Sequence, residues 1–315
     1  MRKFLIKLAI IISPILIGAP ILQPSIDNAL KKTNCSPNYK EWNDIFESKI
    51  NADIIIQGSS RACFHISPKN IDSTLNINSY NLGIDGYQFQ MQFYRFLIYL
   101  KYNKKPKYII QTTDYITLTK PSDLFNYEQF IPYVNNKLIR KAVIEYDGLD
   151  YRDFFIPLYK YIHNQYLFTC AIKSLRGDTF PSNGKYKGFR VQSINWDTSY
   201  LSFKNAHPNG YIEKIDTMTL RLFDSFVMFC LKNEIKLIFI NSPAYFESKR
   251  LLRNSKTIDS IYLSYSHKYN IPYLDYSNDS ICSDTINFYN SQHLNALGVF
   301  KFNNKLSSDL KKIIK

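Results

Sequence analysis

The chain has 315 residues, 45% of them hydrophobic and 16% aromatic, and its formal net charge is +14 at pH 7. This composition is too apolar for a disordered chain, and no repeat with a period of about 20 to 50 residues indicates a solenoid or a propeller. The charge alone would suit a basic binder of nucleic acid or of a membrane surface. However, the basic residues are scattered among acidic ones without a nucleic-acid-binding motif, so we predict no nucleic-acid partner.

Residues 1–24 form a candidate membrane segment. Three basic residues, the last of them Lys7, precede an apolar run from Leu8 to Leu22. Positive charge before an apolar stretch keeps the N-terminus in the cytoplasm and sends the following chain across the membrane. Counted from Phe4, the run approaches the ~20 residues that a spanning helix needs. No A-x-A cleavage site follows, so we expect a membrane anchor with the domain exported to the periplasmic or extracellular side; a cleaved signal peptide is the alternative.

A polar linker is predicted at residues 25–37, and residues 38–315 are predicted to form one α/β domain. Short apolar runs without polar alternation are typical of strands buried on both faces of a parallel sheet; they lie at Ala52–Ile56, Ile77–Leu82, Tyr108–Ile110, Ile235–Ile240 and Ile271–Leu274. Helical spacing separates or follows them at Tyr39–Ile50, Gly86–Leu100, Tyr211–Lys232, Glu247–Tyr269 and Leu294–Ile313. This alternation predicts a doubly wound, flavodoxin-like sheet of five mostly parallel strands.

Residues 116–210 interrupt the alternation and are rich in Tyr, Asp, Asn and Gly. A structureless loop of this length is uncommon in a compact domain. We therefore expect a partly helical insertion packed over one edge of the sheet, which either shapes a substrate site or serves as a structural cap.

The cysteines are odd in number and widely spaced, without a CxxC pair: Cys35, Cys63, Cys170, Cys230 and Cys282. A disulfide-stapled scaffold or a metal cluster would need closer, paired spacing. We expect unpaired thiols, no metal and no cofactor.

Two residues that suit acyl transfer follow from the predicted order of elements. Ligands of open α/β sheets bind at the carboxyl ends of the strands, and the first strand ends in Gly58-Ser59-Ser60. Ser60 would begin a helix, where backbone amides favour developing negative charge. Taken alone, such a turn is more often a helix cap, and a lone histidine such as His293 is usually structural. Together, however, they would bring a nucleophile and a base to one edge of the sheet.

On these residues the sequence resembles the SGNH (GDSL-like) hydrolase superfamily from about Ile54 to the C-terminus. The likeness is greatest to membrane-anchored envelope members near the D-alanyl-lipoteichoic-acid transfer and alginate O-acetylation proteins. The resemblance implies that Ser60, within Gly-Ser-Ser-Arg-Ala, is the nucleophile. It implies that His293, within Phe-Tyr-Asn-Ser-Gln-His-Leu-Asn, is the base, with Gly298 in the helix that follows. Gly83, within Asn-Leu-Gly, matches the glycine whose backbone N–H binds the oxyanion.

Two positions depart from the family pattern. The residue three before the histidine is Asn290 rather than Asp; its amide oxygen can orient His293 but cannot stabilise an imidazolium by charge. In a serine protease triad this change costs roughly 10⁴ in turnover, and Asp279 and Asp284 are nearby candidates to supply the charge. Thr113 stands where the family has an asparagine oxyanion donor, and losing such a donor costs about 10² to 10³.

The resemblance therefore implies a cell-envelope acyl-ester hydrolase or O-acyltransferase that acts on a glycan. Ser60 and His293 would carry the chemistry, the amides of Ser60 and Gly83 with the Thr113 hydroxyl would bind the oxyanion, and water or a glycan hydroxyl would accept the acyl group. Asn290 and Thr113 leave a second interpretation open. In that interpretation the protein is a non-catalytic member of the fold, which binds glycan or assembles with a membrane-embedded acyltransferase.

Overall fold

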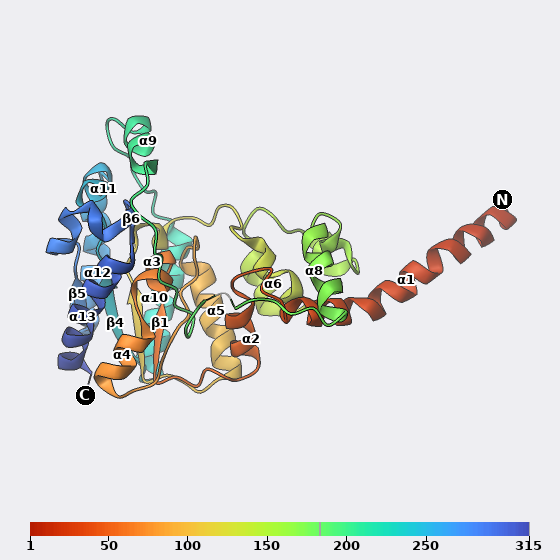
Figure 1. The fold of residues 1–315 in the computed structure, drawn as a ribbon, viewed down its shortest axis with the longest axis horizontal. Coiled ribbons are helices and arrows are strands. Elements are labelled where there is room, and N and C mark those ends of the chain that lie inside the picture. The colour runs from red at the N-terminus through yellow and green to blue at the C-terminus, as the bar shows by residue number, and fades with distance from the viewer. Residues whose placement is uncertain (183, 315) are drawn as a thin grey trace. The chain divides into compact units, whose positions relative to one another are not determined.

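The structure is a computed structural model that describes residues 1–182 and 184–314, without the side chains of residue 2, residues 5–12 and residues 14–16. The chain forms two compact units (Figure 1). The helical unit comprises Met1–Asp44 and Ser122–Asn183, and the sheet unit comprises Ile45–Pro121 and Gly184–Lys315. Each unit is described by itself below.

Five parallel strands form the centre of the sheet unit: β1 (Ile54–Gln57), β2 (Ser79–Asn81), β3 (Tyr108–Thr112), β4 (Lys236–Asn241) and β5 (Tyr273–Asp275). Their order in the sheet is β2-β1-β3-β4-β5, which is the order of a doubly wound, flavodoxin-like sheet. The predicted five-stranded parallel sheet is thus confirmed. The three isoleucines of β1 are fully buried because helices cover both faces of the sheet (Figure 1).

Each face of the sheet packs against its own set of helices. Ile54 and Ile56 belong to a core shared with α3 (Ser60–His65), α4 (Pro68–Leu75) and α13 (Ala296–Ile313). The opposite face meets α5 (Phe89–Tyr102), α10 (Thr217–Lys232) and α12 (Ser255–Tyr269) through aromatic rings. The ring of Phe223 lies 4.9 Å from that of Phe89 and 5.8 Å from that of Phe239. The frequent aromatic residues of the sequence therefore fill much of this second layer.

The remaining elements of the sheet unit are short. They are α9 (Ser199–Ala206), α11 (Phe246–Leu251), the antiparallel pair β6 (Phe288–Asn290) and β7 (His293–Leu294), and the 3-10 turns Tyr115–Leu118, Ser280–Ser283 and Thr285–Asn287. The single helix expected at Glu247–Tyr269 is two helices, α11 and α12. The one expected from Tyr211 begins only at Thr217, where the Asp216 side chain accepts the backbone N–H of Thr219. Such a cap sets a helix start that apolar spacing does not reveal.

The helical unit contains α1 (Arg2–Lys31), most of α2 (Tyr39–Phe46), α6 (Lys137–Val143), α7 (Tyr151–Phe155), α8 (Gln165–Leu175) and the 3-10 turns Tyr127–Gln129, Ile131–Tyr133 and Tyr159–Tyr161. The predicted insertion, residues 116–210, is divided: only residues 122–183 belong to this unit. The predicted linker, residues 25–37, is helical as far as Lys31. Its Asp27 carboxylate is buried and accepts the ammonium of Lys160 at 2.9 Å and the hydroxyl of Tyr161 at 2.6 Å.

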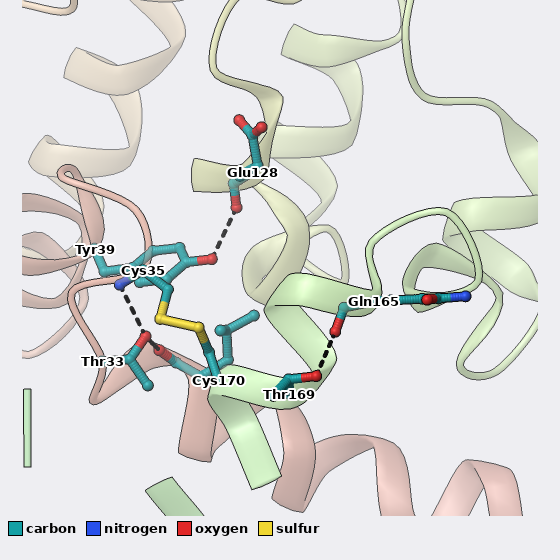
Figure 2. Close-up of a disulfide and its surroundings, with 8 residues drawn as sticks. Thr33, Cys35, Tyr39, Glu128, Gln165, Thr169 and Cys170 are labelled. Carbon is teal, nitrogen blue, oxygen red and sulfur yellow. Dashed lines mark hydrogen bonds between the residues drawn. A yellow bond between two sulfur atoms is a disulfide. The ribbon is translucent and has the colours of Figure 1, made fainter. Parts of the chain in front are cut away.

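A disulfide joins Cys35 to Cys170 within the helical unit, so the prediction that all cysteines are unpaired was wrong. Figure 2 shows the bond linking the segment after α1 to α8. The two cysteines are 135 residues apart, and sequence spacing does not reveal a pairing over that distance. Cys63, Cys230 and Cys282 are buried and lie outside this disulfide.

No helix in the described part of the chain combines the length and apolarity needed to cross a membrane. The side chains of residues 5–12 and 14–16, within the predicted anchor at residues 1–24, lie outside the described residues.

Candidate active site

Ser60 is presented by a tight turn between β1 and α3. Gly58 in this turn has a φ of 152°, and a Cβ at this position would overlap the Thr112 hydroxyl, so only glycine fits. Ser59 caps α3 by accepting the backbone N–H of Arg61 at 3.4 Å. Ser60 is therefore the first residue of the helix, and among the described residues its own N–H has no hydrogen-bond acceptor.

His293 lies directly against Ser60, as predicted from their positions at one sheet edge. The His293 Nε2 is 2.7 Å from the Ser60 Oγ, and the His293 Nδ1 is 2.9 Å from the Asn290 Oδ1. An amide oxygen can only accept, so the ring proton is assigned to Nδ1. Nε2 then accepts the Ser60 hydroxyl. The Asn290 oxygen also accepts the backbone N–H groups of Gln292 and His293 at 3.0 Å each, which fixes its orientation.

The surroundings of His293 keep its ring neutral. The Tyr289 ring stacks on it at 5.3 Å with an interplanar angle of 8°, and the Phe64 ring meets it edge-on at 5.8 Å. Burial, and secondarily the charge of Arg61, lower the pKa of His293 to about 3. The imidazole is therefore in its base form at neutral pH, but it resists taking up a proton.

Neither aspartate suggested as a substitute for Asn290 reaches His293. The Asp284 carboxylate accepts the backbone N–H of Ile286 at 2.9 Å. The Asp279 carboxylate accepts the backbone N–H of Ile281 at 3.0 Å and pairs with Lys305. Both carboxylates are used to cap 3-10 turns, so among the described residues Asn290 is the side-chain hydrogen-bond partner of the His293 Nδ1.

A buried ion pair that sequence reasoning missed supports the Ser60 turn. The Arg61 Nη1 lies 3.3 Å from the Asp114 Oδ1, with both side chains at most 5% exposed. Asp114 also accepts the hydroxyls of Ser59 and, at 3.0 Å, Thr112, while Arg61 donates to the carbonyl of Ser242. The pair thereby ties together the ends of β1, β3 and β4. The available signal was a charged residue within four positions of the end of each of two buried strands.

His65 is a second histidine that the sequence analysis did not single out. It is fully buried, and burial holds its pKa well below the usual range. Its Nε2 accepts the backbone N–H of Leu294 at 3.1 Å, so its Nδ1 carries the proton and donates to the Ser242 hydroxyl at 2.9 Å. His65 thus holds the strand that carries His293.

The other two predicted oxyanion donors are engaged elsewhere. The Gly83 N–H donates to the Asn81 side-chain oxygen at 2.9 Å. Gly83 is needed for close packing, since a Cβ there would lie 2.6 Å from the backbone nitrogen of Cys63. The Thr113 hydroxyl lies 3.4 Å from that of Tyr273. Among the described residues, the Ser60 amide is the one predicted donor that contacts no other polar group.

A small cavity of about 30 Å³ adjoins Ser60 and is lined by Asp114, Tyr115, Tyr211, Glu213 and Gln292, among others. This volume is about that of one water molecule. Burial raises the pKa of Glu213, one of the residues that line the cavity.

No group of three His, Cys, Asp or Glu residues that could hold a metal ion occurs in the described part of the chain.

No family model matches the sequence, and no curated protein is found to be similar to it. Among solved structures, the chain is similar to a protein from Bacteroides fragilis described as a "putative acylhydrolase". The two are 13% identical over 89% of this chain and 98% of that one, with a TM-score of 0.39. Similarity at this level leaves the site to be interpreted from its own geometry.

Proposed function

We propose that the protein is a serine acyl-ester hydrolase or O-acyltransferase with Ser60 as nucleophile and His293 as general base. The observation that carries this proposal is the hydrogen-bond chain from the Ser60 Oγ to the His293 Nε2, 2.7 Å, and from the His293 Nδ1 to the Asn290 Oδ1, 2.9 Å. A serine, a base and an orienting group in this order are what acyl transfer requires. The resemblance of the same segments to SGNH hydrolases supports the proposal.

In the proposed reaction, the Ser60 Oγ attacks the acyl carbonyl while the His293 Nε2 takes the hydroxyl proton. The Ser60 N–H is placed to stabilise the oxyanion. The bond to the leaving alcohol then breaks, and His293 returns the proton to that alcohol. Water or a glycan hydroxyl next gives its proton to His293 and attacks the acyl carbonyl. The bond between the acyl carbon and the Ser60 Oγ then breaks, and His293 returns the proton to the Ser60 Oγ. Asn290 orients the imidazole throughout without neutralising its positive charge.

Covalent labelling with a serine-directed fluorophosphonate tests this proposal. The wild-type protein should be labelled, and Ser60→Ala should not, because the attacking oxygen is gone. Ser73→Ala is the matched control, since this exposed hydroxyl binds the carbonyl of Asn70 rather than His293; it should still be labelled. Labelling that survives Ser60→Ala, or wild-type protein that hydrolyses esters without being labelled, would contradict the assignment of Ser60.

A second candidate function is non-catalytic glycan binding or assembly with a membrane-embedded acyltransferase. It is favoured by the neutral Asn290 beside a histidine with a pKa of about 3, because protonation of His293 lacks a charge partner. Absence of labelling in the wild-type protein, together with measurable binding of an envelope glycan, would favour this function over the enzymatic one.

We further propose that the protein is exported and held at the membrane by its N-terminal helix, with an envelope glycan as substrate. The basic residues before the apolar run support the orientation. The disulfide between Cys35 and Cys170 supports an oxidising compartment. A reporter fused after Lys315 should be active only on the far side of the membrane. Reporter activity in the cytoplasm of cells making the intact protein would contradict export.

A further inference from the structure

A rigid two-residue turn lies at the edge of the candidate active site. Tyr186 and Phe189 exchange backbone hydrogen bonds of 2.9 and 3.0 Å. Between them Lys187 and Gly188 have φ values of 47° and 79°, as in the type I′ turns of tight hairpins. A Cβ on Gly188 would overlap the carbonyl oxygen of Asn81, and the Asn81 N–H donates to the Lys187 carbonyl at 2.9 Å. The turn is therefore fixed on the end of β2.

This turn places Arg190 beside the helix that begins with Ser60. The Arg190 backbone N–H donates to the Cys63 carbonyl at 3.2 Å. The Arg190 guanidinium carbon lies 5.7 Å from the centre of the Phe64 ring. The centre of the same ring is 5.8 Å from that of His293. Arg190 and the proposed general base thus share one aromatic neighbour.

The Arg190 guanidinium is incompletely satisfied within the protein. Its Nε is buried and has no hydrogen-bond partner, and among the described residues no carboxylate forms an ion pair with it. The nearby Asp85 is half-buried, and burial raises the pKa of its carboxyl group above the usual value. The charge of Arg190 opposes this rise but does not cancel it. The Arg190 side chain as a whole is only partly buried, and among the described residues its Nη groups have neither a hydrogen-bond nor an ion-pair partner. An anion from outside can therefore reach these two N–H groups and supply the missing acceptors.

We infer that Arg190 binds an anionic group of the substrate, a carboxylate or a phosphate carried next to the acyl ester. This inference rests on the proposed acyl-transfer function and narrows its substrate class. The planar guanidinium is suited to bidentate pairing with either group. The net charge of +14 would also raise the local concentration of an anionic polymer.

Binding to the full-length Ser60→Ala protein tests the inference without requiring turnover. The probes are 4-acetoxybenzoate, 4-acetoxyphenyl phosphate and the neutral methyl 4-acetoxybenzoate, measured by calorimetry. Arg190→Gln should weaken binding of the anionic probes about tenfold and leave the methyl ester unchanged, whereas Arg190→Lys should retain part of the preference. Arg250→Gln is the matched control. Arg250 also lies over a phenylalanine ring, with its guanidinium carbon 4.8 Å from the centre of the Phe246 ring. Arg250→Gln should leave the binding of all three probes unchanged.

Asp85→Asn provides a second variant that does not depend on how Arg190→Gln folds. Removing this carboxylate should tighten binding of both anionic probes severalfold and not that of the methyl ester. Whichever anionic probe binds more tightly in an Arg190-dependent way identifies carboxylate or phosphate as the preferred group. Equal weakening of all three probes by Arg190→Gln, or no weakening, would overturn the inference. Failure of fluorophosphonate labelling would instead count against the enzymatic proposal alone.

Discussion

Replacing Asn290 with aspartate isolates the effect of charge beside His293. The amide oxygen of Asn290 already accepts the His293 Nδ1–H at 2.9 Å, so the substitution changes charge while keeping position. The two backbone N–H groups that donate to the same oxygen, at 3.0 Å each, would stabilise the new carboxylate in its ionised form. The geometry of the Ser60–His293 pair should therefore be preserved.

The expected magnitude follows from this geometry. An imidazolium and a carboxylate about 4 Å apart attract each other by roughly 4 kcal/mol at an effective dielectric constant of 20, or about three pKa units. The pKa of His293, about 3 in the wild type, should rise to about 6. If the proton is half transferred in the transition state, about half of this energy is gained there, and kcat should rise about 30-fold.

The assay is hydrolysis of a simple activated ester as a function of pH, with circular dichroism to verify folding. Asn290→Asp should raise kcat and move the acidic limb of the pH profile upward. Ser60→Ala in the same background should abolish the gain. A folded Asn290→Asp variant with unchanged kcat and an unchanged acidic limb would refute the reasoning. If the wild type, Asn290→Asp and an added Thr113→Asn are all inert and unlabelled, the non-catalytic function is supported.

Three other outcomes are expected. Replacing Cys35 and Cys170 by serine together should lower the free energy of unfolding by about 2 to 5 kcal/mol, measured by urea denaturation of oxidised protein; an unchanged midpoint would contradict a structural disulfide. The lowered pKa values of His65 and His293 mean that only the unfolded chain gains these protons as pH falls from about 6.5 towards 3. Stability should therefore be retained above about 6.5 and lost progressively below it. Substituting glutamine for His65 should flatten the urea-midpoint profile over this range. Gly83→Ala should destabilise the fold, since its Cβ would lie 2.6 Å from a backbone nitrogen of α3; a wild-type melting temperature would refute this packing role.

The sequence was most informative where a feature depends on neighbours in the chain. The run of isoleucines predicted β1 because burial on both faces requires apolar residues at consecutive positions. Asn290 and His293 were paired in advance because the resemblance places the orienting residue three before the histidine, and in the structure the antiparallel turn between β6 and β7 brings the two side chains together. Ser60 was singled out because the glycine turn before it is encoded locally.

Features that join distant segments could not be predicted in the same way. The Arg61–Asp114 pair depends on the order of β1 and β3 in the sheet, and His65 acquires its role only once Leu294 lies beside it. Gly83 was matched to an oxyanion donor, but whether its amide is available depends on the rotamer of Asn81. Arg190 lies in the predicted insertion, where no periodic pattern indicated which side chains approach the site.

The buried pair of Asp27 and Lys160 limits how the N-terminus can be processed. Ile26 is 5% exposed, Asp27 3% and Lys160 1%, so the end of α1 belongs to the interior of the helical unit. A peptidase that cut after Asp27 would leave the Lys160 ammonium buried without its counter-charge, which costs several kcal/mol. Any cleavage that leaves a stable protein must therefore fall before Ile26, and a mature form would still contain the end of this helix.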